Sequence, residues 1–365
     1  MAICFFFLLL YSVLILRYLY GWNRNKIINK SITSYKVSVL IAMRNESKHV
    51  DRIINEFQLQ DYSKDNLELI IINDHSTDHT LELLSNQNIV NLKVLNLEVG
   101  EYGKKNAINK GLEQAKGDII ITTDADCSFG SLWVQKMVSY FTSEDVKLVA
   151  GPVNYNKANS IFNKFQTLDF LSLIASGAGA IGNNNSIFCN AANMAYRKSV
   201  IINNSNINNP EVVSGDDVFL LHSIKRDYKD AIKFAKHNDA IVMTDPKSTF
   251  FSLLNQRKRW AAKSTSYTDL TTIYVSVLVL IINIVLLFLF VQSFLANTFI
   301  FFLIFYFVKL IVDSLLLFRA LSFFKRKDLL LWVLPFEFFY SIYIVLIVVL
   351  SYASDFKWKG RIHKK

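Results

Sequence analysis

The chain has 365 residues, of which 52% are hydrophobic, against about 45–50% in a typical soluble domain. The apolar excess lies near the two ends, which excludes an ordinary soluble protein and leaves a globular domain in the middle. The net charge of +10 fits a surface that faces a membrane, since no nucleic-acid motif accompanies it. Three distant cysteines exclude a disulfide framework, and the six histidines show no metal-ligand spacing.

The first apolar run extends from Ala2 to about Tyr20, which is long enough to cross a bilayer. A cleaved signal peptide would have basic residues before the run and a small-residue cleavage site after it. Here the basic residues lie at the end of the run and after it: Arg17, Arg24, Lys26 and Lys30. We therefore predict an uncleaved anchor over residues 1–22 and a linker over 23–35, with the chain from Asn23 onward in the cytoplasm.

From Val37 the pattern alternates between strand and helix. Buried strands are predicted at Val37–Met43, Leu67–Asn73, Leu92–Leu95 and Ile119–Thr123, and helices at Val50–Gln58, from Thr80 to Ser85 and at Asn106–Ala115. This alternation predicts an α/β domain with a mostly parallel sheet over residues 36–250. Ligands of such sheets bind beyond the carboxyl ends of the strands, and those positions are polar here.

Polar residues follow the first two predicted strands, as Ala42 to Glu46 and as Asn73 to Asp78. At the end of the second strand, the carboxylate of Asp74 could accept a hydrogen bond from a nucleobase or a ribose hydroxyl. The alternative is helix capping, which fits Ser76 or Asp78 better. We predict ligand contact for Asp74 and capping for Asp78.

An Asp-x-Asp pair, Asp124 and Asp126, directly follows the strand Ile119–Thr123. Two carboxylates at this spacing can share one hard cation, with diphosphate oxygens completing its coordination. Such a pair recurs by chance in loops, but its place after a buried strand raises its value. Lys104 opens the preceding helix, where a lysine and a helix N-terminus both favour phosphate.

A second acidic pair, Asp216 and Asp217, follows Gly215 and precedes the apolar run from Val218 to Leu221. A sugar hydroxyl that attacks an anomeric carbon needs a general base, and a carboxylate near another carboxylate suits that role. The alternative is an acidic cap on a helix that begins near Val218, and both readings can hold together.

The segment Gln256-Arg257-Lys258-Arg259-Trp260 lies in a predicted interfacial stretch, residues 251–270. Its aromatic ring could stack on a sugar, and its arginine could pair with a diphosphate. A basic and aromatic belt beside the membrane explains the same composition. Composition alone does not separate the two readings.

The second apolar block covers residues 271–352 and divides into Ile273–Val291, Phe299–Phe318 and Leu329–Leu350. Alternation then places the basic tail, residues 353–365, outside, against the positive-inside rule. Either the last segment re-enters the membrane with a bend at Pro335, or the rule fails here.

Charged residues within this block are Lys309, Asp313 and Glu337. Intramembrane charges usually mark function or pairing. We favour an intrahelical pair between Lys309 and Asp313 over the lining of a pore.

Residues Val37 to Trp260, with the flanking apolar segments, resemble membrane-bound family 2 glycosyltransferases of the GT-A fold, in the Q-x-x-R-W subgroup. That subgroup includes synthases of cellulose, hyaluronan, chitin and poly-N-acetylglucosamine, and also ceramide glucosyltransferase. The order, spacing and context of five motifs carry the resemblance. It implies a GT-A domain flanked by one N-terminal and about three C-terminal transmembrane helices.

The resemblance also implies site residues and a divalent cofactor, Mn²⁺ or Mg²⁺. The implied donor-binding residues are Ala42, Glu46, Asp74, Lys104 and Asp124, and the implied metal ligands are Asp126 and Asp124. Asp217, beside Asp216, matches the inferred base of an inverting displacement. Gln256, Arg259 and Trp260 match the motif that borders the acceptor and the diphosphate.

Three positions depart from the family pattern. His75 stands for a glycine, Asn73 for an aspartate, and Ala191 for the glycine of the Cys189–Asn193 stretch. These departures leave the donor open more than the activity. The Gly, Ala and Asn-rich stretch Ser176–Asn185 reads as a loop, either mobile over the site or plain surface.

The sequence thus predicts a glycosyltransferase of the inner cell membrane that uses a nucleotide-sugar donor on the cytoplasmic side. UDP is favoured only because the family mostly uses it. About four membrane segments are few for a polymer channel, which favours a lipid-linked or membrane-associated acceptor. A processive polysaccharide synthase is the alternative, and a transporter or inactive scaffold is the non-enzyme reading. No nucleic-acid partner is expected, and a partner subunit stays unknown.

Overall fold

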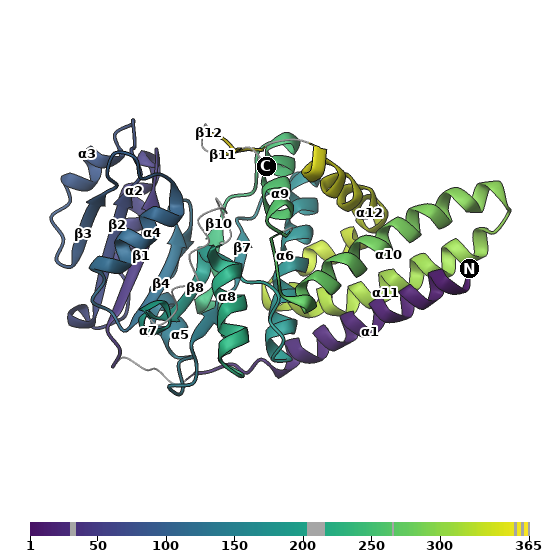
Figure 1. Ribbon diagram of the computed structural model, residues 1–365, viewed down its shortest axis with the longest axis horizontal. Coiled ribbons are helices and arrows are strands. Elements are labelled where there is room, and N and C mark those ends of the chain that lie inside the picture. The colour runs from purple at the N-terminus through teal and green to yellow at the C-terminus, as the bar shows by residue number, and fades with distance from the viewer. Residues whose placement is uncertain (30–33, 203–215, 265, 354–355, 359–360, 364–365) are drawn as a thin grey trace. The chain divides into compact units, whose positions relative to one another are not determined.

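The computed structural model describes residues 1–29, 34–202, 216–264, 266–353, 356–358 and 361–363 (Figure 1). Gly215, which we placed in the second acidic motif, lies outside these residues. The chain divides into two compact units. The sheet unit comprises residues 25–156 and 189–245, and the helical unit comprises residues 1–24, 157–188 and 246–365.

A seven-stranded sheet of order β3-β2-β1-β4-β8-β6-β9 forms the centre of the sheet unit. Its strands are β1 (Val37–Met43), β2 (Leu67–Asn73), β3 (Leu92–Asn96), β4 (Ile119–Asp124), β6 (Leu148–Ala150), β8 (Met194–Arg197) and β9 (Ile232–Phe234). Strands β1 to β4 pair in parallel, and β8 runs antiparallel to both β4 and β6. The mostly parallel sheet is confirmed.

The central strands are mostly apolar because helices cover both faces of such a sheet. Six of the seven residues of β1 are buried, as are six of the seven in β2. The helices of this unit are α2 (Val50–Gln58), α3 (Thr80–Ser85), α4 (Gly103–Gln114), α5 (Trp133–Val138), α7 (Lys198–Ile202) and α8 (Asp216–Asp227). Short 3₁₀ turns lie at η1 (Ser47–His49), η2 (Lys64–Asn66), η3 (Ala191–Asn193) and η5 (Asn238–Ala240), and a small second sheet joins β5 (Ser128–Phe129), β10 (Val242–Thr244) and β7 (Val153–Tyr155).

The register of the sheet brings its polar carboxyl ends level. Ala42 of β1 lies opposite Ile72 of β2 on one side and opposite Asp124 of β4 on the other. The loops that leave these three strands therefore start at the same edge of the sheet.

The helical unit contains α1 (Ala2–Arg24), α6 (Ile161–Gly182), α9 (Phe250–Ser264), α10 (Leu270–Leu295), α11 (Phe299–Phe323) and α12 (Leu330–Ala353), with η6 (Lys327–Leu329) and a hairpin of β11 (Phe356–Trp358) and β12 (Arg361–His363). Four helical stretches are long and apolar enough to span a membrane: Ala2–Arg24, Leu270–Leu295, Phe299–Phe323 and Lys327–Ser351. One N-terminal and three C-terminal candidate spans are confirmed. Helix α12 continues through Pro335.

The predicted loop Ser176–Asn185 is wrong over most of its length, because α6 continues to Gly182. A Cβ atom added at Gly179 would meet the backbone of Tyr18, and one at Gly182 would meet the backbone of Gly21. Small residues let two helices approach closely. The composition that we read as a loop instead serves the contact between α6 and α1.

The predicted domain over residues 36–250 is interrupted in the structure. Residues 157–188, which contain α6, group with the apolar helices rather than with the sheet. The physical reason is that α6 is buried on several sides, with Phe170, Leu171 and Ile174 among its core residues, and so needs other helices around it.

Three charged residues of the apolar helices, Lys309, Asp313 and Glu337, form one cluster within the helical unit. The Lys309 ammonium donates to Asp313 Oδ2 at 2.8 Å and also pairs with Glu337 of α12. Tyr11 of α1 donates to Asp313 Oδ1 at 2.7 Å. The expected intrahelical pair is present, but it extends across three helices, which satisfies charges that would be costly alone in a membrane.

Candidate active site

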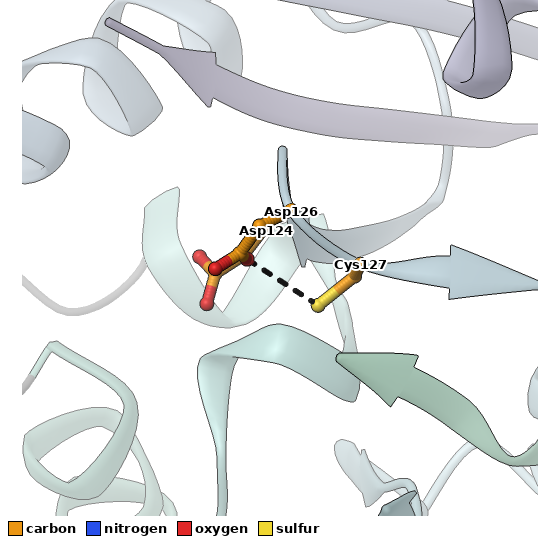
Figure 2. Close-up of side chains that lie close together, drawn as sticks. All are labelled: Asp124, Asp126 and Cys127. Atoms are coloured by element: carbon orange, nitrogen blue, oxygen red, sulfur yellow. Dashed lines mark hydrogen bonds between the residues drawn. The ribbon is translucent and has the colours of Figure 1, made fainter. Parts of the chain in front are cut away.

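Three possible metal ligands meet in the loop that follows β4. One ligand atom from each of Asp124, Asp126 and Cys127 lies within 4.8 Å of the others. Figure 2 shows the two carboxylates side by side, with the thiol of Cys127 directed at Asp126. Both aspartates are partly exposed, whereas Cys127 is fully buried.

The donor atoms of this cluster fit a hard divalent cation. Burial, and then the charges of Asp124 and Asp126, raise the pKa of the Cys127 thiol well above its ordinary value. The thiol therefore stays neutral and donates weakly to Asp126 Oδ1 at 3.9 Å. The other ligand atoms of the cluster are the carboxylate oxygens of Asp124 and Asp126, a type of ligand that Mg²⁺ and Mn²⁺ prefer.

Lys104, at the start of α4, forms an ion pair with Asp124. Burial opposes the charge of Lys104, but Asp124 and, more weakly, Asp217 outweigh it and raise the pKa of the lysine. The side chain keeps 27% of its surface exposed. Lys104 and Asp124, which we predicted in the same motif, are thus in direct contact, and the charge of Asp217 also acts on the lysine.

Asp217 stands near the N-terminus of α8 and is oriented by two backbone groups. Its Oδ2 accepts from the Ala191 N–H at 3.1 Å, and its Oδ1 accepts from the Val218 N–H at 2.9 Å. The Ala191 carbonyl in turn accepts from Thr122 of β4 at 3.0 Å. One short chain of hydrogen bonds thus joins the predicted base to the strand that carries Asp124. Helix α8 begins at the adjacent Asp216.

The predicted donor residue Asp74 is almost fully buried, with 4% of its surface exposed. Its Oδ2 accepts from the Gly103 N–H at 3.0 Å, and its Oδ1 lies 3.8 Å from Arg44 Nη1. Asp74 thus ties the loop after β2 to the first residue of α4, directly before Lys104. Its contact with a nucleoside stays a prediction.

The loops after β1 and β2 are joined by hydrogen bonds. The Asn45 N–H donates to Ser76 Oγ at 3.0 Å, and the Thr77 N–H donates to Asn45 Oδ1 at 2.8 Å. The Glu46 N–H donates to Thr80 Oγ1 at 2.9 Å. Ala42 and Glu46 therefore lie beside the Asp74 loop, and their roles in nucleoside binding also stay predictions.

Gln256, Arg259 and Trp260 lie on α9 in the helical unit. Arg257, one residue after Gln256, donates through Nη1 to Gln256 Oε1 at 3.2 Å, and its guanidinium lies 4.2 Å from the centre of the Trp260 ring. Trp260 also contacts Phe170 of α6, with ring centroids 6.3 Å apart. Contact of this segment with acceptor and diphosphate stays a prediction.

Sequence reasoning missed two sets of supporting residues. Arg257 Nη2 lies 2.6 Å from Asp169 Oδ2, and both side chains are buried. An aspartate inside the otherwise apolar stretch of α6 was the available signal. The second set, on α2, contacts backbone atoms of the loop after β4, and sequence offers no signal for such contacts.

The parallel sheet, with an Asp-x-Asp pair at the carboxyl end of β4, defines a domain of the GT-A fold, the class built to bind nucleotide-sugars. Residues 38–204 match the family described as Glycosyl transferase family 2. The chain therefore carries a family 2 glycosyltransferase domain.

Two curated relatives share part of the chain. The glycosyltransferase AglE of Haloferax volcanii is 32% identical over 125 residues, which are 34% of this chain and 41% of AglE. The poly-β-1,6-N-acetyl-D-glucosamine synthase of Staphylococcus epidermidis is 31% identical over 165 residues, which are 42% of this chain and 38% of the synthase. Each match spans about two fifths of the relative.

A solved structure shares the fold over nearly the whole chain. The mannosyltransferase PcManGT from Pyrobaculum calidifontis, described in complex with GDP-Man and Mn²⁺, has a TM-score of 0.58 and 15% identity. The match covers 94% of this chain and 96% of PcManGT. At this identity the likeness shows the fold.

Proposed function

We propose that the protein is an inverting, metal-dependent glycosyltransferase that moves a sugar from a nucleotide-sugar to a lipid-linked or membrane-associated acceptor. Two observations carry the proposal. Lys104 pairs with Asp124, which lies two residues from Asp126, and hydrogen bonds through Ala191 join Asp217 to the strand that carries Asp124. Lys104, Asp124 and Asp126 lie within residues 38–204, which match family 2, and this position supports the proposal. The charges suit a substrate that must release a diphosphate.

Asp126 and Asp124 would hold Mn²⁺ or Mg²⁺, whose charge stabilises a departing diphosphate. Lys104 lies beside Asp124 at the first turn of α4, where its ammonium and the helix N-terminus both attract phosphate oxygens. Asp74 accepts a hydrogen bond from Gly103, the first residue of that turn, and so fixes the position of the helix N-terminus that would bind phosphate.

Asp217 is the proposed general base, with Asp216 beside it. The N–H groups of Ala191 and Val218 fix the orientation of the carboxylate. Asp217 accepts the proton of the acceptor hydroxyl as the hydroxyl oxygen bonds to the anomeric carbon. The bond to the diphosphate breaks at the same time, and its electron pair leaves with the nucleoside diphosphate, so that the anomeric centre inverts.

The membrane part of the proposal rests on the four apolar helices. The basic residues after the first helix favour a cytoplasmic sheet unit in the inner cell membrane. UDP-sugars are the favoured donors by resemblance, whereas the likeness of fold to PcManGT makes GDP-sugars worth testing. A processive synthase is the second candidate, supported by the partial match to the S. epidermidis synthase.

The test is nucleotide release by the detergent-purified protein with a panel of UDP- and GDP-sugars and Mn²⁺ or Mg²⁺. Membrane lipid extract is added or omitted, and Asp217→Asn serves as the control. We expect release with one donor, stimulation by lipid, and loss in the variant. Release that stays unchanged in Asp217→Asn would contradict the assigned base, and a long polysaccharide product would favour the synthase.

A further inference from the structure

One side of α2 contacts the backbone of the loop that carries the metal-binding aspartates. Arg52, Glu56 and Gln60 follow one another at intervals of four residues, which places them along one face of the helix and its continuation. Glu56 accepts from the Phe129 N–H at 3.0 Å. Gln60 donates to the Gly130 carbonyl at 3.0 Å and accepts from the Val134 N–H at 3.1 Å.

Arg52 makes the contacts nearest to the metal site. Its Nη2 donates to the Ala125 carbonyl at 3.3 Å and to the Cys127 carbonyl at 3.1 Å. These two carbonyls belong to the residues before and after Asp126. A single planar nitrogen with two hydrogens can serve both acceptors, which the fixed fork of a guanidinium allows.

The two bonds restrain the peptide between Ala125 and Asp126 and the peptide that follows Cys127, and so limit how far the short segment with Asp126 can turn. The guanidinium also places a positive charge close to a loop that carries two carboxylates. Carboxylates that share a site repel each other until a cation binds. Because the loop is already restrained, cation binding does not have to lose the conformational entropy of ordering it, which is the advantage of preorganised ligands.

We propose that Arg52 is a positioning residue of the divalent-metal site, which holds Asp126 in the orientation that the ion and the diphosphate require. Arg52 contacts the loop backbone and acts through Asp126. This inference rests on the proposed function of Asp124 and Asp126 as metal ligands. Glu56 and Gln60 fix the backbone that follows this loop, at Phe129, Gly130 and Val134.

The experiment measures Mn²⁺ affinity by electron paramagnetic resonance of free Mn²⁺, with the full-length protein in detergent and UDP or GDP present. Arg52→Met removes both hydrogen bonds and the charge. Arg52→Lys keeps the charge but ends one atom short of Nη2. Lys48→Met, in the turn before α2, removes an equal charge without touching the loop.

We expect Arg52→Met to weaken Mn²⁺ binding about tenfold or more, as loss of a residue that orients a ligand does. Arg52→Lys should show a smaller loss, and Lys48→Met should bind as the wild type does. In the transfer assay the Mn²⁺ concentration for half-maximal rate should rise, while kcat at saturating Mn²⁺ changes less. Thermal unfolding checks that the variants are folded. If Arg52→Met does not fold, the comparison of Arg52→Lys with the wild type still tests the inference.

Wild-type Mn²⁺ affinity in both Arg52 variants would overturn the inference, as would an equal loss in Lys48→Met, which would show an effect of charge alone. Either result leaves the proposed function standing if the wild type binds Mn²⁺ and transfers sugar. Absence of Mn²⁺ binding by the wild type with either nucleotide would overturn both.

Discussion

His75 has φ 52°, in the left-handed region that favours glycine. It follows Asp74 directly, at the position where the family resemblance expects a glycine. Its Nε2 lies 2.9 Å from the Glu101 carbonyl oxygen, and its ring centre lies 4.8 Å from that of Tyr102. These contacts offset the cost of the backbone conformation, which is about 1–2 kcal/mol for an ordinary residue.

His75→Ala should therefore be less stable than His75→Gly. The alanine keeps the unfavourable backbone conformation and loses the contacts with Glu101 and Tyr102, whereas glycine loses the contacts but relieves the conformation. We expect a difference of about 1 kcal/mol, measured as a lower thermal unfolding midpoint for His75→Ala in the same detergent. Equal midpoints would show that the backbone of residue 75 is not strained.

Asp78 should make its contribution to stability dependent on pH. Slight burial raises the pKa of Asp78, but hydrogen bonds from Thr80 and Ser47 outweigh this effect and lower the pKa to about 2. Its carboxylate accepts from the Thr80 N–H at 3.0 Å and from the Ser47 N–H at 3.2 Å, so it joins η1 to the start of α3. The ordinary pKa of 3.8 lies higher, so the stabilisation is present above pH 3.8 and is lost as pH falls toward 2.

Asp78→Asn should unfold at a lower temperature than the wild type at pH 6, because one amide oxygen cannot accept from both loops. The difference in unfolding temperature between Asp78→Asn and the wild type should narrow between about pH 4 and pH 2. Because Asp78 is exposed, we expect a modest effect. A gap that stays constant down to pH 2 would indicate that the charge of Asp78 is unimportant.

At the scale of elements, α6 and α9 are joined by one buried ion pair. Arg257 donates through Nε to Asp169 Oδ2 at 2.8 Å, and Tyr343 of α12 lies 3.5 Å from the same oxygen. Arg257 lies within the segment that the resemblance assigns to acceptor and diphosphate, and Asp169 lies on α6. The geometry of the pair positions α9, which carries Gln256, Arg259 and Trp260.

Asp169→Asn should destabilise the protein by about 3–5 kcal/mol, because Arg257 then faces no carboxylate in a buried site. The double variant Asp169→Leu with Arg257→Met removes both charges and should recover much of that loss. Thermal unfolding in detergent compares the two. A double variant less stable than Asp169→Asn would argue that the pair contributes net stability.

At the scale of the whole molecule, the parallel strands and the apolar helices could be predicted from sequence, because both are continuous apolar runs. Strands β1 and β2 begin and end at the predicted residues. The short strands β6, β8 and β9 were not predicted, because three or four residues carry too little pattern. For α6, the Gly and Ala residues suit both a loop and a close helix contact, and only the neighbouring α1 decides between them.

Some residues of the candidate site, like some elements of the fold, could be predicted from the sequence, and others could not. Asp124 could be located because it follows an apolar run at the end of a strand, and Asp217 because it precedes one at the start of a helix; their roles stay predictions. Arg52 could not be located, because its partners are backbone carbonyls more than seventy residues away. Any amino acid could supply those carbonyls, so no pattern marks them.

Removal of divalent metal should abolish sugar transfer by the whole protein. EDTA would remove the cation that we propose Asp124 and Asp126 bind, and added Mn²⁺ should restore the rate. Asp126→Ala should lose activity that Mn²⁺ does not restore. Full activity in EDTA would contradict a metal-dependent mechanism.

The chain passes between its two units four times, after residues 24, 156, 188 and 245. Neither unit is therefore one continuous stretch of sequence. A truncation to residues 25–245, the obvious soluble fragment, would keep α6 and expose its apolar surface to water. A fragment suited to crystallisation would need a short linker from Asn156 to Cys189 in place of that helix. Because the sheet unit is made of two separate stretches of sequence, joining the chain to another protein at one position cannot replace all of the apolar helices attached to it.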